Sequence, residues 1–392
     1  MAERSSALLL QLLAATAALV GPAAASAQSD AASGTSVSYR HGDYDEDRLE
    51  PAPLDGSDRR YRVRTDQFQL NTELGDSDQL SVGLVHEAMS GSSPWFSFPD
   101  ADGDALQVMS GATIRDTRHE VSAAWSRDRG DAGSIGASAS YSAEDDYHAA
   151  ALGLDWQRPL SAAIDLGLGA SFSHDIIDPT DAAEFDRIDR AIKNTWSAFG
   201  SLTFVLDRSS QLQAGMQLTH ANGYLSDPYK RYYAGDRILS DARPDQRTQG
   251  ALLLRWRRAF VEQDGALHLD YRLAGDSWGV RSHTVEASWY QSLPHAFRIV
   301  PGLRWYSQGA ASFYAPFSAA GTVGTYHSSD YRLAANGSVS ASIDVRQRLG
   351  AWEWVIGIER LRAHDALGFG GEPDPGRVSY TQIQAGFDYH FE

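Results

Sequence analysis

The sequence predicts an all-β protein, a single antiparallel transmembrane β-barrel of about 16 strands in an outer membrane, with long extracellular loops and short periplasmic turns. Three observations predict this class. Apolar and polar side chains alternate along many segments, short and long connections alternate between those segments, and the chain closes on an aromatic strand. Because successive side chains of a strand point to opposite faces, such a segment offers one face to lipid and the other to water.

The N-terminus has the features of a secretory signal peptide. A basic residue, Arg4, precedes the apolar stretch 7–20, and residues 25–27 (Ala-Ser-Ala) form a small-x-small cleavage site. We therefore predict a cleaved signal peptide over residues 1–27 and one barrel domain over residues 28–392. The alternative is an N-terminal membrane anchor, which the dilution of the apolar stretch by Gly, Pro and Ala disfavours.

The predicted strands are segments in which apolar residues recur at every second position. In one of them, Leu269 and Tyr271 alternate with Asp270 and Arg272. Many of the segments are near the length of about 9–11 residues that a tilted membrane strand needs. The predicted strands span 35–41, 61–74, 79–88, 115–126, 134–142, 147–158, 163–173, 194–205, 211–221, 247–258, 265–274, 279–290, 297–307, 331–346, 352–363 and 380–391.

The connections between these strands alternate in length along much of the chain. The tight turns have turn-forming composition and span 75–78, 128–132, 206–210 and 349–351. The long polar stretches span 42–60, 89–114, 174–193, 222–246, 308–330 and 364–379. The first long stretch follows the first strand, which fits a barrel with periplasmic termini, short periplasmic turns and long outer loops.

The last strand, 380–391, has an aromatic and a polar face. Phe387 and Phe391 fall on one face and Asp388 falls on the other. This is typical of the terminal strand of an outer-membrane barrel, although Glu392 follows where such chains usually end on the aromatic residue. We expect the barrel-assembly machinery of the envelope to bind this strand.

Composition limits the classes of partner. A net charge of −17 argues against nucleic acid, whose phosphates require a basic surface. The absence of cysteine excludes disulfides, thiolate metal sites and cysteine nucleophiles. Lys193 and Lys230 are the only lysines, and every other basic residue besides histidine is arginine, whose planar fork binds phosphate in two-point fashion. We therefore expect outer-membrane lipid and lipopolysaccharide as partners, although a GC-rich genome also explains the preference for arginine.

Charged residues of both signs alternate with the apolar positions of the predicted strands. If the registers hold, these residues line the barrel interior. They are Arg255, Arg257, Asp270, Arg272, Glu286, Arg298, Arg304, Glu353, Glu359, Asp388 and His390. Since a barrel of about 16–18 strands is wide enough to leave an aqueous channel, we predict a porin-like channel or facilitator for small polar solutes. The alternatives are a structural or export partner of another envelope protein and an outer-membrane lipid hydrolase.

Two long loops, 89–114 and 222–247, are rich in aromatic residues. Loops longer than about 12–15 residues are usually functional or disordered. Exposing so many aromatic rings to water is unfavourable, so we expect at least one of these loops to fold inward and narrow the lumen. The alternative is that the two loops pack on each other above the rim. The expected constriction residues are Trp95, Phe96, Phe98, Tyr224 and Tyr229.

Evidence for metal binding or catalysis is weak. Asp100, Asp102 and Asp104 stand two residues apart around a glycine, a spacing from which calcium takes oxygen ligands, although the full EF-hand pattern is absent and a solvated acidic turn explains it as well. We expect no other cofactor and no catalytic residues. A hydrolase needs a serine and a histidine at the outer face, and candidates by type exist without a recognisable signature. They are His283, His295 and His327 with Ser282, Ser288, Ser292 and Ser328.

Two loop stretches carry a resemblance to a known family. Residues 82–121 contain Val-Gly-Leu-Val-His-Glu-Ala-Met and Ser-Pro-Trp-Phe-Ser-Phe-Pro, and residues 223–230 read Gly-Tyr-Leu-Ser-Asp-Pro-Tyr-Lys. The chain resembles, over nearly all of its mature length, an uncharacterised family of predicted proteobacterial outer-membrane β-barrels known as a domain of unknown function. The resemblance implies a barrel and its location. It also implies a partner in an envelope redox or export system, but it supplies no substrate and no catalytic residue.

Overall fold

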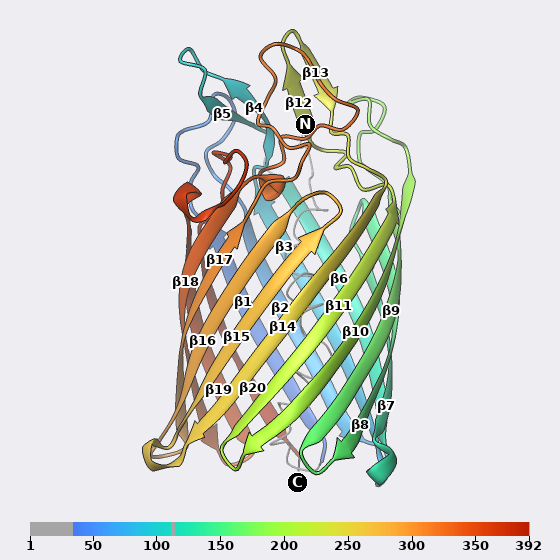
Figure 1. The fold of residues 1–392 in the computed structure, drawn as a ribbon, viewed down its shortest axis with the longest axis vertical. Helices are drawn as coiled ribbons and strands as arrows, with labels where there is room; N and C mark the ends of the chain where they lie inside the picture. Colours follow the sequence, from blue (N-terminus) through green and yellow to red (C-terminus); the bar gives the residue numbers. More distant parts are fainter. Residues whose placement is uncertain (1–33, 111–113, 392) are drawn as a thin grey trace.

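The computed structural model describes residues 34–110 and 114–391. They form an all-β architecture in which sixteen strands close into one antiparallel barrel (Figure 1). The predicted signal peptide, residues 1–27, lies outside the described residues. Within the described ranges, no helix is long and apolar enough to cross a membrane.

Each barrel strand pairs with its neighbours along the chain. The barrel strands are β1 (Ser36–Glu46), β2 (Arg62–Glu73), β3 (Asp78–Gly91), β6 (Ile114–Asp128), β7 (Ser134–Ala143), β8 (Tyr147–Ser161), β9 (Ile164–Ile177), β10 (Ala191–Asp207), β11 (Ser210–Gly223), β14 (Gln246–Phe260), β15 (Gly265–Asp276), β16 (Arg281–Leu293), β17 (Phe297–Gln308), β18 (Asn336–Leu349), β19 (Trp352–Ala363) and β20 (Tyr380–His390). The last strand closes the barrel on the first, with His41 opposite Ala385. Every predicted strand corresponds to one barrel strand, so the predicted fold class and strand number are confirmed.

Four strands were not predicted from the sequence. β4 (Pro94–Pro99) pairs with β5 (Ala105–Met109), and β12 (Arg231–Ala234) pairs with β13 (Arg237–Ser240). Both hairpins lie within the two aromatic loops and stand beyond the rim of the barrel (Figure 1). They were missed because neither face of these short strands meets lipid, so the apolar alternation that marks a barrel strand is absent.

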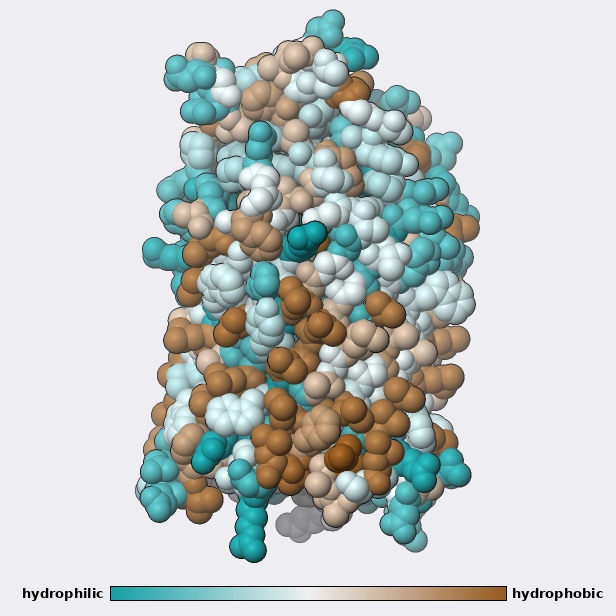
Figure 2. All heavy atoms as spheres, in the orientation of Figure 1, coloured by the Kyte–Doolittle hydropathy of each residue, from teal (hydrophilic) through white to brown (hydrophobic). Residues whose placement is uncertain are grey.

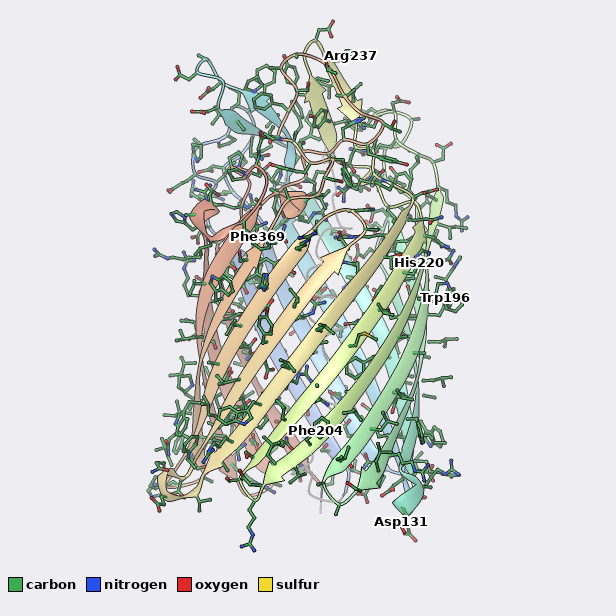
Figure 3. All side chains as sticks on the ribbon, viewed as in Figure 1. Asp131, Trp196, Phe204, His220, Arg237 and Phe369 are labelled. Atoms are coloured by element: carbon green, nitrogen blue, oxygen red, sulfur yellow. The ribbon has the colours of Figure 1, made fainter. Side chains whose placement is uncertain are left out.

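The outer face of the barrel is apolar. Leu152 and Leu154 on β8 and Ile356 on β19 expose more than half of their surface, as lipid-facing side chains do. Trp196 of β10 likewise points away from the wall (Figure 3). Apolar side chains gather over the lower half of the face in view in Figure 2, with hydrophilic residues toward both ends.

Aromatic rings gather where the last strands reach the short-turn end. The rings of Trp352 and Trp354 stack with centroids 5.8 Å apart, and Trp352 lies 4.7 Å from the ring of Tyr389. Amphipathic rings favour this headgroup level. Ser36 and His390 pair at the same end, so both ends of the barrel chain lie beside the short turns, as predicted. The long connections all lie at the opposite, outer end.

Candidate functional site at the outer loops

Five long connections meet over the outer end of the barrel. Backbone hydrogen bonds join them, including Ser92 N–H to Arg59 O at 3.2 Å, Ala242 N–H to His327 O at 3.0 Å and Ala335 N–H to Glu372 O at 3.0 Å. We call this assembly the outer cap, and Figure 1 shows it standing above the strands. It comprises residues 47–61, 92–110, 224–245, 309–335 and 364–379.

Asp330 is the centre of the outer cap. Its Oδ2 lies 2.7 Å from Nη2 of Arg243, and its Oδ1 accepts a hydrogen bond from Nε of Arg332 at 2.8 Å. Each arginine also binds a second carboxylate, Asp241 at 2.6 Å from Arg243 and Asp227 at 2.7 Å from Arg332. Burial by itself raises the pKa of the Asp330 carboxyl, but the two guanidinium groups outweigh it and hold that pKa well below its ordinary value. The cluster is therefore an ionised network inside protein.

Two further cations lie near the Tyr331 ring. Arg60 pairs with Glu46 at 2.6 Å and sits 5.2 Å from the ring centroid, whereas the Lys230 ammonium sits 5.6 Å from it. Nζ of Lys230 donates to Ser93 Oγ at 3.0 Å. Burial lowers the pKa of the Lys230 ammonium to about 8. These contacts tie the start of β4 and the 224–245 loop to the first connection of the barrel.

Asp374 joins the β4–β5 hairpin to the last two connections. Its carboxylate accepts hydrogen bonds from the Tyr314 hydroxyl at 2.7 Å, Gln107 Nε2 at 2.5 Å and the backbone N–H of Gly376 at 2.6 Å. Burial raises the pKa of this carboxyl to about 6, against the opposing effect of these donors. Asp374 is therefore a buried cap carboxyl whose charge changes near pH 6.

The predicted constriction residues take part in this cap. Phe96 is buried, Trp95 packs edge-on against it at 5.4 Å, and Phe98 lies 4.4 Å from the ring of Tyr233 in β12. The Tyr229 hydroxyl donates to Asp146, and Tyr224 is half-buried. The two aromatic loops thus pack on each other, which was the alternative arrangement. That they narrow the lumen stays a prediction.

The predicted lumen residues all lie on the face opposite the exposed apolar side chains. On β15, for example, Leu269 and Tyr271 are exposed to the outside, so Asp270 between them points inward. Asp270 pairs with Arg257 and lies 3.8 Å from Arg255. Asp388 pairs with Arg40 at 2.6 Å and Glu353 lies 3.6 Å from Arg346. The remaining members, Arg272, Glu286, Arg298, Arg304, Glu359 and His390, share the inward register.

The predicted calcium residues form an exposed turn. Oδ1 of Asp100 accepts the backbone N–H groups of Asp102 at 2.9 Å and of Asp104 at 2.8 Å. This hydrogen bonding gives the aspartate spacing a structural explanation as the turn of the β4–β5 hairpin. Of the histidines considered for a hydrolase, His283 bonds the Tyr271 hydroxyl at 2.8 Å and His327 Nε2 lies 3.1 Å from Ser240 O.

A family described as "Protein of unknown function (DUF3570)" matches residues 9–371. The chain belongs to this family. The resemblance inferred from the loop stretches is therefore confirmed. No curated protein matches the chain.

Two solved structures share the barrel architecture. One is described as a bacterial polysaccharide outer membrane secretin, with a TM-score of 0.52 and 7% identity over 93% of this chain and 100% of that chain. The other is CdiB from Acinetobacter baumannii, with a TM-score of 0.51 and 9% identity over 91% of this chain and 60% of that chain. At these identities the likeness shows the fold alone, that of an outer-membrane β-barrel.

Sequence reasoning missed one group of carboxylates. Asp116 on β6 meets Glu144 and Asp146 from the short connection between β7 and β8, and all three are buried. In the sequence, Glu144 and Asp146 read as a solvated acidic turn and Asp116 lies nearly thirty positions earlier. Only the pairing of β6 with β7 brings them together.

Proposed function

We propose that this protein is an outer-membrane channel for small polar solutes whose outer mouth is opened and closed by the outer cap. The observation that carries the proposal is the interior wall, where ion pairs such as Arg257–Asp270 and Arg40–Asp388 replace a packed apolar core. A wall of this chemistry suits water, and a sixteen-strand barrel has the width for an aqueous lumen.

The ionic character of the cap supports a mouth that opens. Buried ion pairs contribute little net stability, because the desolvation of both charges offsets their attraction. A cap joined by Arg243, Arg332 and Asp330 can therefore separate into water, where each group is hydrated again, while the hydrogen-bonded barrel below stays intact. Opening would also expose the apolar cluster that contains Ala311, Tyr314 and Leu333 to water, so we expect the closed cap to predominate.

Single-channel recording in planar bilayers tests the proposal. We expect the full-length protein to open rarely, and a variant lacking residues 91–108 to open more often and with larger conductance, because the deletion removes Ser93, Ser97 and Gln107 from the cap. Asp270→Asn in the deletion background should shift ion preference toward anions, since it removes an inward negative charge beside Arg257. A folded, heat-modifiable barrel that stays silent with and without residues 91–108 refutes the channel.

A specific observation favours a second candidate, a structural or export partner for another envelope protein. Apolar side chains are exposed at the tips of the cap, with Ile238 at 54% and Tyr326 at 45%. Such residues beyond the membrane level suit contact with another protein. Absence of conductance, together with a stoichiometric complex that is lost in Ile238→Ser, would favour this role over transport.

A further inference from the structure

Three carboxylates converge inside the outer rim of the barrel. Asp116 lies near the outer end of β6, and Glu144 and Asp146 lie in the connection from β7 to β8. One oxygen from each residue lies within 4.8 Å of the other two. Their exposed fractions are 6%, 8% and 2%, so little water solvates them. Three like charges at this spacing repel each other strongly in a buried setting.

Glu144 lacks the compensation that a buried carboxylate normally has. Its Oε2 is buried and accepts no hydrogen bond from the described residues. The nearby guanidinium of Arg118 is held at 2.6 Å by both Glu87 and Glu120, so its charge is shared. An unsatisfied oxygen on a buried carboxyl that lies beside two other buried carboxylates indicates a missing positive ligand.

We propose that Asp116, Glu144 and Asp146 bind a divalent cation, with calcium as the fitting ion. Calcium takes hard oxygen ligands at about 2.3–2.6 Å, so ligands on opposite sides of the ion lie about 4.6–5.2 Å apart. The oxygens of the cluster all lie within 4.8 Å of one another, so a single ion of this size can reach all three. Magnesium demands a strict octahedron at about 2.0–2.1 Å and usually keeps several of its waters, so a site of three buried carboxylates suits it less well.

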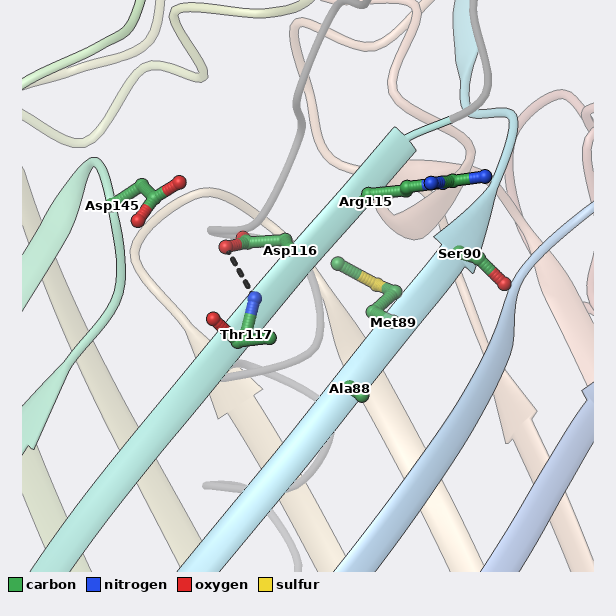
Figure 4. A pocket seen from close by; sticks show the side chains of 7 residues that line it. All are labelled: Ala88, Met89, Ser90, Arg115, Asp116, Thr117 and Asp145. Carbon is green, nitrogen blue, oxygen red and sulfur yellow. Dashed lines mark hydrogen bonds between the residues drawn. The ribbon is translucent and has the colours of Figure 1, made fainter.

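The cluster borders a cavity through one of its members, Asp116. A cavity of about 410 Å³ lies against it and is lined by Asp116 and Asp145 together with Met89, Arg115 and Thr117 (Figure 4). Oδ1 of Asp116 accepts the backbone N–H of Thr117 at 2.7 Å, which holds this carboxylate in place. A second acidic residue, Asp145, also lines this cavity, and its negative charge offsets the positive charge of Arg115 there.

Binding at this cluster connects to the outer cap through Tyr229. Its hydroxyl donates to Asp146 and accepts the backbone N–H of Thr180 at 3.1 Å. The Arg187 guanidinium lies 4.5 Å from the Tyr229 ring and donates to Thr180 O at 2.8 Å. A cation that fixes Asp146 therefore also orders the 178–190 loop and its contact with the cap. This inference does not depend on transport.

Calcium titration by calorimetry of the full-length protein in detergent tests the site. We expect one ion per barrel with a dissociation constant of about 10⁻⁴ to 10⁻³ M, the range of extracellular calcium modules. Glu144→Gln, which keeps the shape and removes the charge, should weaken binding at least tenfold. Asp102→Asn is the matched control, because it removes a carboxylate from the exposed acidic turn and should leave binding unchanged.

A second readout follows the 178–190 loop. Calcium should slow tryptic cleavage after Arg187 in the wild-type protein and in Asp102→Asn, but not in Glu144→Gln. Heat-modifiable migration on gels establishes that each variant has folded, and Asp146→Asn provides a second test if Glu144→Gln fails to assemble. Three outcomes overturn the proposal: no calcium binding by the wild-type protein, unchanged affinity in a folded Glu144→Gln or Asp146→Asn variant, or loss of binding in Asp102→Asn.

Discussion

Replacing Asp330 with asparagine tests whether ionic contacts hold the outer cap together. The Asp330 side chain is 0% exposed and binds Arg243 and Arg332, which come from two different loops. Asparagine keeps the size of the side chain but removes the negative charge that both guanidinium groups face. Each arginine retains one other carboxylate, Asp241 or Asp227, so the network is weakened and not abolished.

The expected loss in the stability of the closed cap follows from the burial of these ion pairs. Removing one partner of a buried ion pair costs about 3–5 kcal/mol, and the remaining carboxylates place Asp330→Asn near the lower end. A loss of about 3 kcal/mol multiplies the population of the open cap by roughly a hundredfold, because about 1.4 kcal/mol is tenfold. The barrel should be unaffected, since its strands are joined by their own hydrogen-bond ladders.

Hydrogen exchange measured by mass spectrometry separates the cap from the barrel. The reporting amides are Ala242 N–H and His327 N–H, which bond each other's carbonyl groups across two loops at 3.0 and 2.8 Å. We expect their protection to fall by roughly a hundredfold in Asp330→Asn, with the protection of β14 unchanged. Asp236→Asn is the control. The Asp236 side chain is 95% exposed, and its ion pair with Arg237, at 3.8 Å, contributes little to stability. Equal protection in the wild-type protein and Asp330→Asn, or an equal loss in the control, would refute the reasoning.

Two further predictions concern pH and the lipid face. The pKa of Asp374 in the folded protein is about 6, above the ordinary value of 3.8. The protonated carboxyl therefore stabilises the closed cap fully below about pH 4, and this stabilisation is lost as the pH rises through 6. Cap amides should therefore exchange faster at pH 7 than at pH 5 after correction for intrinsic rates, and Asp374→Asn should abolish that difference. Leu154→Arg, on a side chain 68% exposed to lipid, should destabilise the barrel in vesicles by about 2–4 kcal/mol in urea titration. Gln157→Arg, on the inward face of the same strand, should cost much less, and equal losses would contradict the assigned faces.

The barrel was predictable because lipid imposes a strict period on the sequence. Leu252 and Leu254 must face lipid while Arg255 and Arg257 must not, so a one-residue error in register places charges in the membrane. Strand ends were less predictable. β9 continues to Ile177, although the alternation of apolar and polar residues ends near residue 173. The outermost residues of a strand lie beyond the lipid, so their side chains need not alternate.

The outer cap was not predictable for the opposite reason. Its residues are polar, and polar residues in a long loop read as solvated. The pairs that organise the cap are distant in sequence, with Arg243 and Asp330 separated by 87 positions and Asp227 and Arg332 by 105. No local pattern marks such pairs. The aromatic content of the two loops did indicate burial, but it could not distinguish a lumen constriction from loops packed on each other.

The two lysines indicate that the basic residues of the outer end are chosen by geometry. Nζ of Lys193 lies 2.8 Å from Asp175 and donates to the Tyr147 hydroxyl at 2.7 Å, and Lys230 is buried against Ser93 and the carbonyl of Pro94. Codon usage alone does not explain why both exceptions to arginine lie in crowded polar positions. An arginine at position 230 would bury five N–H donors where these two oxygens are the acceptors, whereas a lysine brings a compact group with three. Arginine is used instead where paired carboxylates accept its planar fork, as at Arg332, so the cap distinguishes the two cations by the number of acceptors that each position offers.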